Sequence, residues 1–188
     1  MTIQRVQLEA ELTRLLQPQL FRDYCPNGLQ VQGKNEINKL VTGVTASAAL
    51  IESALDAGAD CLLVHHGYFW KGEDQTITGL KKTRVEKLLA SQLNLFAYHL
   101  PLDMHKEFGN NVELGRLLGF QFEAATGRPG DPEIVFIGKL AQPTTLEALS
   151  AQIDSSLQRA PLCIGDPGQE LRRVAWCTGA AQSYFDVA

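Results

Sequence analysis

The sequence lacks several features that mark common classes of protein. No apolar run among its 188 residues approaches the roughly 20 that a helix needs to cross a bilayer. The N-terminus does not have the charged-then-apolar pattern of a signal peptide. Lysine and arginine number 17 against 21 aspartates and glutamates, which argues against a broad electropositive surface for nucleic acid. We therefore expect a cytoplasmic protein with no membrane partner and no extended nucleic-acid surface.

Cysteine is also scarce. The four cysteines, at positions 25, 61, 163 and 177, form no Cys-x-x-Cys motif. Cys61 and Cys177 lie inside apolar runs that are typical of buried strands, where a thiol behaves as a small hydrophobic group. This distribution predicts reduced core thiols.

What is present indicates an α/β fold. The 45% of apolar and 20% of charged residues are ordinary for a globular protein with a substantial core. Helical spacing of leucines alternates along the chain with short apolar runs, which favours a sheet covered by helices on both faces. The helices expected are 5–17, 46–58, 82–92, 111–118 and 144–157. The strands expected are 29–32, 39–45, 61–64, 95–99, 133–140 and 171–178.

Polar side chains follow two of these strands. His65 and His66 come directly after the apolar run 61–64, and His99 and Asp103 follow the strand predicted over 95–99. Because ligand sites in such sheets lie beyond the carboxyl ends of the strands, we expect these side chains to lie close together. Three of the four histidines of the chain belong to this group.

The histidine pair favours a metal site over the simpler interpretation of a polar loop. Adjacent side chains can point to opposite sides of the backbone, and Gly67 gives the chain freedom to turn so that both reach ions. Imidazole suits zinc and iron, whereas the carboxylate of Asp103 also suits manganese or magnesium, so the metal stays open. Asp103 could instead cap the helix near Asn110, although it lies several residues too early.

The remaining candidates have weaker signals. His99 could orient a metal ligand or act as an acid–base group, which makes it the candidate catalytic residue. Tyr68 and Lys71 are candidates for substrate binding, through stacking on a planar base and contact with a phosphate. The alternatives are packing against the sheet for Tyr68 and plain solvent exposure for Lys71.

A glycine- and proline-rich stretch over 124–132 predicts a domain boundary. We expect an N-terminal α/β lobe over 1–124 that carries the metal ligands, and a second α/β module over 125–188. The run 173–178 can be aligned with 40–45 as a weak internal repeat. If the second copy continued as the first does, its next strand would lie beyond Ala188, so the module is expected to be truncated.

Four motifs together resemble one family. They are the runs 23–31 (DYCPNGLQV), 41–47 (VTGVTAS), 65–73 (HHGYFWKGE) and 99–103 (HLPLD). This combination resembles the NIF-three-like proteins, a dinuclear-metal-centre family also known as GTP cyclohydrolase 1 type 2 homologues. The resemblance covers essentially the whole chain, with a looser middle.

The resemblance implies two related α/β lobes around a dinuclear metal cleft, a homohexamer, and two divalent metal ions per subunit. It assigns His65, His66 and Asp103 to metal positions of the family. The family's remaining ligands, in a His-x-x-x-Glu motif, have no match here, because His105 is the only later histidine and is followed four residues on by Gly109. A C-terminal segment is therefore expected to be missing.

Three functional hypotheses follow. The first is a divalent-metal-dependent hydrolase acting on a small molecule such as a nucleotide or related heterocycle, as the family name implies. The second is a non-catalytic, metal-binding hexameric scaffold, because no unambiguous nucleophile or general base accompanies the ligands. The third is an inactive truncated fragment.

Overall fold

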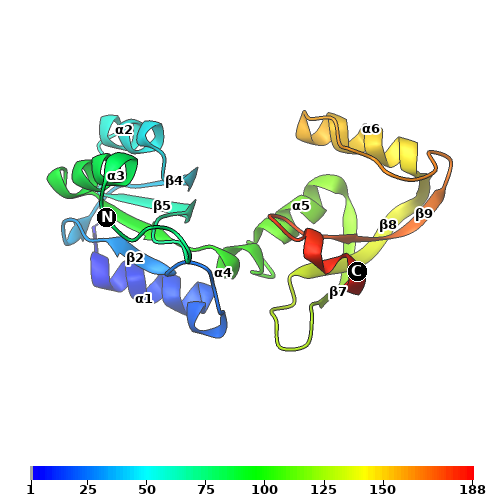
Figure 1. Ribbon diagram of the computed structural model, residues 1–188, viewed down its shortest axis with the longest axis horizontal. Helices are drawn as coiled ribbons and strands as arrows, with labels where there is room; N and C mark the ends of the chain where they lie inside the picture. Colours follow the sequence, from blue (N-terminus) through cyan, green and yellow to red (C-terminus); the bar gives the residue numbers. More distant parts are fainter. Residues whose placement is uncertain (1) are drawn as a thin grey trace. The chain divides into compact units, whose positions relative to one another are not determined.

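The chain folds as two compact units, one ending at Leu102 and one extending from Asp103 to Ala188. The computed structural model describes residues 2–188, and Figure 1 follows them in order along the sequence. Strands and helices alternate through most of the first unit, whereas the second has an antiparallel sheet with helices. The predicted α/β fold class is confirmed.

The first unit is built on a four-stranded sheet in the order β2-β6-β5-β4. Its strands are β2 (Gly28–Val31), β4 (Leu40–Thr45), β5 (Cys61–His66) and β6 (Asn94–Ala97). The strands β4, β5 and β6 are parallel, and β2 joins the edge of β6 in the antiparallel direction. A separate short pair, β1 (Ile3–Gln4) with β3 (Glu36–Ile37), lies outside this sheet.

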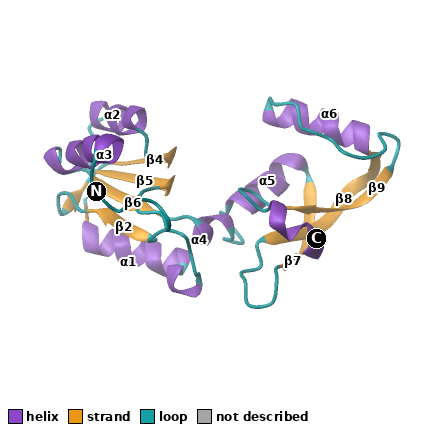
Figure 2. Cartoon of the chain, viewed as in Figure 1, coloured by secondary structure: helices purple, strands orange, loops and turns teal. Residues whose placement is uncertain are grey.

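Helices cover both faces of this sheet (Figure 2). They are α1 (Arg5–Leu16), followed by the 3₁₀ helix η1 (Pro18–Leu20), then α2 (Ala48–Asp56) and α3 (Gly79–Ala90). Because side chains alternate along a strand, Leu62 and Val64 of β5 face the core shared with α2 and α3, while Cys61 packs in the core beneath α1. The sheet is therefore buried on both sides, as its apolar strands predict.

The sequence predicts these elements to within a few residues, with one informative difference. The strand expected over 61–64 continues as β5 through His66, so both histidines belong to the strand instead of following it. The helix α2 begins after Ser47, whose hydroxyl accepts a hydrogen bond from the N–H of Leu50, and ends before Gly58 in the left-handed region.

The second unit contains a three-stranded antiparallel sheet in the order β7-β8-β9. Its elements are α5 (Asn110–Leu118), β7 (Phe120–Thr126), β8 (Val135–Thr145), α6 (Leu146–Leu157), β9 (Glu170–Trp176) and the 3₁₀ helix η2 (Gln182–Val187). The short helix α4 (Leu100–Asp103) spans the division between the units. Asn111 ties α5 to the sheet, because its backbone carbonyl accepts from the indole of Trp176 and its side chain binds the N–H of Thr178.

Two details of this unit differ from the predicted pattern. The strand β7 has no counterpart among the expected strands, and it runs into the stretch 124–132 that the composition predicts as a boundary. In addition, β9 pairs antiparallel with β8, whereas β4 pairs parallel with β5, so the aligned runs 40–45 and 173–178 differ in their strand pairing. The division into domains over 1–124 and 125–188 stays a prediction, and the compact units divide earlier, after Leu102.

Within residues 2–188, no helix has both the length and the apolar character to cross a membrane.

A buried carboxylate anchors the first unit at the start of β5. Asp60 accepts hydrogen bonds from the backbone N–H groups of Asn38 (2.7 Å) and Lys39 (3.0 Å), and its other oxygen forms an ion pair with Lys34. Burial by itself raises the pKa of Asp60, but these partners outweigh it and lower the pKa below its ordinary value. The carboxylate therefore stabilises the fold in its ionised form.

The substitution Asp60→Asn is expected to lower the free energy of unfolding by about 1–3 kcal/mol near pH 7, because buried hydrogen bonds to a charged group are lost. A carboxyl whose pKa is lowered on folding stabilises fully above its unfolded pKa of about 4, and this stability is lost as the pH falls through the folded value. Between about pH 7 and pH 3, urea unfolding should therefore show a larger loss of stability for the parent than for Asp60→Asn. The control Asp56→Asn, exposed at the end of α2, should change stability by less than about 0.5 kcal/mol; an equal effect of both substitutions would contradict this account.

Candidate metal centre

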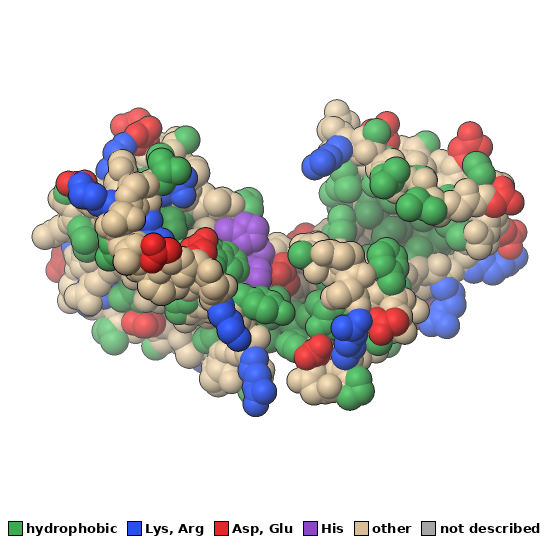
Figure 3. All heavy atoms as spheres, viewed as in Figure 1, with side chains coloured by type: hydrophobic (Ala, Val, Ile, Leu, Met, Phe, Trp, Pro, Cys, Tyr) green, Lys and Arg blue, Asp and Glu red, His purple; other side chains and the backbone are tan. Residues whose placement is uncertain are grey.

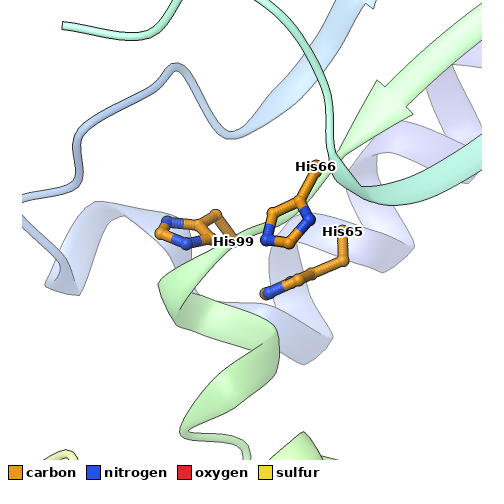
Figure 4. Close-up of side chains that lie close together, drawn as sticks. All are labelled: His65, His66 and His99. Atoms are coloured by element: carbon orange, nitrogen blue, oxygen red, sulfur yellow. The ribbon is translucent and has the colours of Figure 1, made fainter. Parts of the chain in front are cut away.

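Three imidazole rings converge where β5 and β6 end (Figure 4). The parallel pairing sets Val64 beside Ala97, so His65 and His66 at the end of β5 lie near His99, two residues past β6. The ring centroid of His65 is 4.3 Å from that of His66 and 5.0 Å from that of His99. Nitrogen atoms from the three rings lie within 4.8 Å of one another, close enough to hold a metal ion. Figure 3 shows histidine side chains gathered on one exposed patch.

Hydrogen bonds at Nδ1 orient the two histidines of β5. His65 Nδ1 lies 3.1 Å from the carbonyl oxygen of Tyr98, which can only accept, so Nδ1 carries a proton and donates it to that oxygen. His66 Nδ1 lies 3.2 Å from the hydroxyl of Thr45, the residue beside it on β4. Such partners fix ring orientation in metal-binding histidines.

Asp23 orients the third histidine. Its carboxylate accepts a hydrogen bond of 2.7 Å from Nδ1 of His99 and another of 2.8 Å from the side-chain amide of Asn27. The side-chain carbonyl of Asn27 in turn accepts from the backbone N–H of His99. Burial raises the pKa of Asp23, but the hydrogen bonds from His99, Asn27 and two backbone N–H groups outweigh it, so the pKa lies below its usual range. The ionised carboxylate therefore accepts a proton from Nδ1 and fixes the orientation of the His99 ring.

Asp23 and Asn27 were not among the site residues predicted from the sequence. Both lie in a run rich in turn formers, and in a loop such residues ordinarily satisfy their own backbone. Their partners are 76 and 72 residues away along the chain. The one signal available was that Asp23 and Asn27 belong to the first of the four family motifs.

A second possible metal group, formed by Asp23, Cys25 and His99, is less suited to an ion. Each oxygen of Asp23 already accepts two hydrogen bonds, since the N–H groups of Tyr24 and Leu100 add to those of His99 and Asn27. Burial and the charge of Asp23 raise the pKa of the Cys25 thiol to about 12, so the sulfur is protonated near neutral pH. The three-histidine group is the better candidate.

Asp103, the predicted carboxylate ligand, is the first residue of the second unit. It is buried, and its Oδ1 accepts hydrogen bonds from the amide of Asn110 (2.7 Å) and the hydroxyl of Thr178 (3.2 Å). Asp103 does not cap the following helix, because the N-cap residue of α5 is Gly109 and the helix has no side-chain cap hydrogen bond. Its role as a metal ligand stays a prediction.

The loop after β5 contains the predicted substrate-binding residues. Tyr68 is buried and donates a hydrogen bond of 2.7 Å from its hydroxyl to the carbonyl of Ala46, whereas Lys71 is exposed. Trp70, which was not among the predicted site residues, packs its indole edge-on against His99 at a centroid distance of 4.8 Å. Phe69 has a φ of +65°, a left-handed conformation that is unusual for a large side chain. The loop therefore turns sharply beside the histidines.

Comparison with known proteins identifies the family. A family model described as Duf34/NIF3 (NGG1p interacting factor 3) matches residues 3–188. The chain belongs to the Duf34/NIF3 family. This confirms the relationship that the four sequence motifs predict.

Individual relatives of the Duf34/NIF3 family agree in sequence and in fold. A protein of Pseudomonas aeruginosa named GTP cyclohydrolase 1 type 2 homolog is 50% identical over 182 residues, which cover 96% of this chain and 71% of that protein. The solved structure of protein ybgI, described as of unknown function, has a TM-score of 0.91 and 45% identity over 98% of this chain and 73% of its own. Protein TTHA1606 of Thermus thermophilus has a TM-score of 0.83 and 32% identity, and the match covers 99% of this chain and 74% of that one.

Gly67 permits a close approach of the backbone to Gln30 and Ala97 directly after the histidines. A methyl group at this position would lie 2.1 Å from Oε1 of Gln30 and 2.6 Å from the Cβ of Ala97. The side chain of Gln30 could rotate, but the methyl of Ala97 is fixed on β6. Gln30 also binds both backbone groups of Tyr68, so its displacement would release the loop.

The substitution Gly67→Ala is expected to lower the free energy of unfolding by about 1–3 kcal/mol, because the added methyl overpacks the strand. Denaturant unfolding followed by circular dichroism measures this change. Gly168→Ala is the matched control, since its added methyl would meet only an oxygen of Asp166 at 3.6 Å, an ordinary contact. Equal stability of Gly67→Ala and the parent would refute the proposed close approach.

Proposed function

We propose that this chain is a divalent-metal-dependent hydrolase that acts on a nucleotide or a related heterocycle. The observation that supports the proposal most directly is the convergence of His65, His66 and His99 at the carboxyl ends of two parallel strands. The name carried by its relatives, GTP cyclohydrolase 1 type 2 homolog, supports the substrate class.

The proposed metal ligands are His65, His66 and Asp103. They combine nitrogen donors with a hard oxygen donor, a set that accepts zinc, iron, manganese or magnesium. We propose two divalent ions per subunit and a homohexamer, both from the family resemblance. A divalent ion held there supplies a water of lowered pKa and polarises the group under attack.

The other residues act on the substrate side. Asp23 holds the Nδ1 proton of His99, which leaves Nε2 as the nitrogen that takes a proton from water and returns it to the leaving group. Lys71 is exposed in the loop after β5, where an ammonium can meet a phosphate. Tyr68 holds that loop through its hydrogen bond to Ala46, which keeps Trp70 against His99.

A non-catalytic metal-binding scaffold is the second candidate function. His99 is the only acid–base candidate among the three clustered histidines, and its ring lies where it could bind the ion itself. If it does so, the site has no acid–base group, which favours the scaffold. A residue that binds an ion through Nε2 has no lone pair with which to move a proton. Turnover separates the two candidates.

Metal analysis of the gently purified chain is expected to find about one or more divalent ions per subunit, since imidazole and carboxylate ligands bind such ions tightly. Elemental analysis by inductively coupled plasma mass spectrometry measures the content. The variant His66→Ala should lose metal, while His105→Asn, outside the cluster, should retain it. Metal-free protein after purification in the presence of each candidate ion would reject the proposal.

A screen of purine nucleotides, with GTP first, is expected to reveal metal-dependent ring opening or hydrolysis by the parent chain. The substitution His66→Ala should lower the rate by more than about 100-fold, because it removes a proposed ligand. Chromatography of the products with and without a chelator measures this. A chain that binds metal stoichiometrically but converts no substrate in the screen would favour the scaffold.

A further inference from the structure

A small cavity in the second unit is lined by four aromatic side chains. They are Phe120 and Phe122 of β7, Phe136 of β8 and Trp176 of β9. The ring centroids stand 5.3 Å apart for Phe120 and Trp176, 4.7 Å for Phe122 and Phe136, and 5.8 Å for Phe136 and Trp176. Every residue that lines the cavity lies between Asp103 and Ala188, so the second unit forms it alone.

The fold fixes the aromatic walls of this cavity. Phe136 and Trp176 are buried, and the indole N–H of Trp176 donates a hydrogen bond of 2.8 Å to the carbonyl of Asn111. Gly115 of α5 also lines the cavity, and a methyl group there would stand 2.9 Å from Cζ2 of Trp176. The helix therefore lies directly against the indole and leaves the cavity unfilled. Because the indole N–H is already used, the aromatic walls offer apolar contact.

The cavity has the size of one aromatic ring. Its volume is about 150 Å³. An apolar cavity of about this volume holds no water and accepts a molecule of benzene. Stacking of a bound ring on aromatic neighbours adds to the gain from burying its apolar surface. Phe122 is 48% exposed, so one wall of the cavity reaches the surface, where a ligand can enter.

The lining of the cavity also carries positive charge. Lys106 and Arg116 are the charged residues among those that line it, and both are exposed. Arg116 forms an ion pair with Glu113, whereas Lys106 forms no ion pair with any of residues 2–188. The three side chains together leave one excess positive charge. This charge matches a ligand with a single negative charge, such as a carboxylate.

We propose that this cavity binds a small aromatic carboxylate. The ring of the ligand lies among the four aromatic side chains, and its carboxylate meets Lys106 and Arg116. The size favours a small molecule over a peptide segment, which needs a longer groove. The site goes beyond the proposed metal-dependent function, because none of the proposed metal ligands lines it.

The test titrates the full chain with benzoate, phenylacetate and 3-phenylpropionate and follows its indole N–H resonances by NMR spectroscopy. The chain has two tryptophans, so the spectrum of Trp70→Phe assigns the resonance of Trp176. That resonance is expected to shift with a Kd of about 0.1–1 mM for at least one acid, a range typical of ligands of this size. Benzyl alcohol, which is neutral, should bind at least about tenfold more weakly. No shift of Trp176 with about 10 mM of any acid would overturn the proposal, as would equal affinities for the acids and the alcohol.

Substitutions separate the contribution of the ring from that of the charge. Val112 also lines the cavity, so Val112→Phe should fill it and abolish the shift. The double substitution Lys106→Met with Arg116→Met should raise the Kd of the acids by about tenfold and change that of the alcohol by less than about twofold. These two side chains are exposed, so this measurement does not depend on the folding of Val112→Phe.

The matched control is Lys139→Met, which removes an exposed lysine of the same unit that does not line the cavity. It should leave the Kd of the acids unchanged. If the double variant binds the acids as tightly as the parent chain does, or if Lys139→Met weakens them equally, the proposed site is overturned.

Discussion

The parallel pairing of β5 with β6 is the constraint on which the candidate site depends. It aligns Val64 with Ala97 and so brings the ends of both strands to one edge of the sheet. A shift in register by one residue would turn every side chain of β5 to the opposite face. The apolar alternation that buries Leu62 and Val64 against α2 and α3 therefore also fixes the directions in which His65 and His66 point.

Asp23 couples this sheet edge to a loop distant in sequence. Its two oxygens accept from His99, from Asn27 and from the backbone on both sides of the site, including the first residue of α4. An ionised carboxylate with all its lone pairs used is a rigid support, since breaking one contact leaves a buried charge less well compensated. The same contacts that stabilise the loop also fix the orientation of the His99 ring.

Much of the fold could be predicted from the sequence because its signals are local. The leucines of α1 and the apolar run at the start of β5 each act within a few residues, and the structure confirms both elements. The strand β7 was missed because Phe120–Thr126 is followed at once by a run of glycine and proline that obscured where pairing with β8 begins. The antiparallel pairing of β9 depends on β8 and cannot be read from the resemblance of 173–178 to 40–45.

The candidate site was only partly predictable, because some of its residues meet only through contacts between distant parts of the sequence. His65, His66 and His99 stand out by residue type and by position after apolar runs, and the structure brings them together. Asp23 and Asn27 were missed, because an aspartate and an asparagine in a turn are ordinary and only the folded chain sets them against His99. Long-range partners of this kind leave no periodic pattern in a single sequence.

The nitrogen donors and the oxygen donor proposed as metal ligands come from different parts of the chain. All three imidazoles belong to the unit that ends at Leu102, and the carboxylate of Asp103 is the first donor of the next unit. Imidazole nitrogens bind ions such as zinc and iron tightly, whereas harder ions such as magnesium and manganese prefer oxygen donors. On the proposed function, the imidazoles at the sheet edge would suit zinc or iron, and the carboxylate of Asp103 would extend the set of accepted ions to manganese and magnesium.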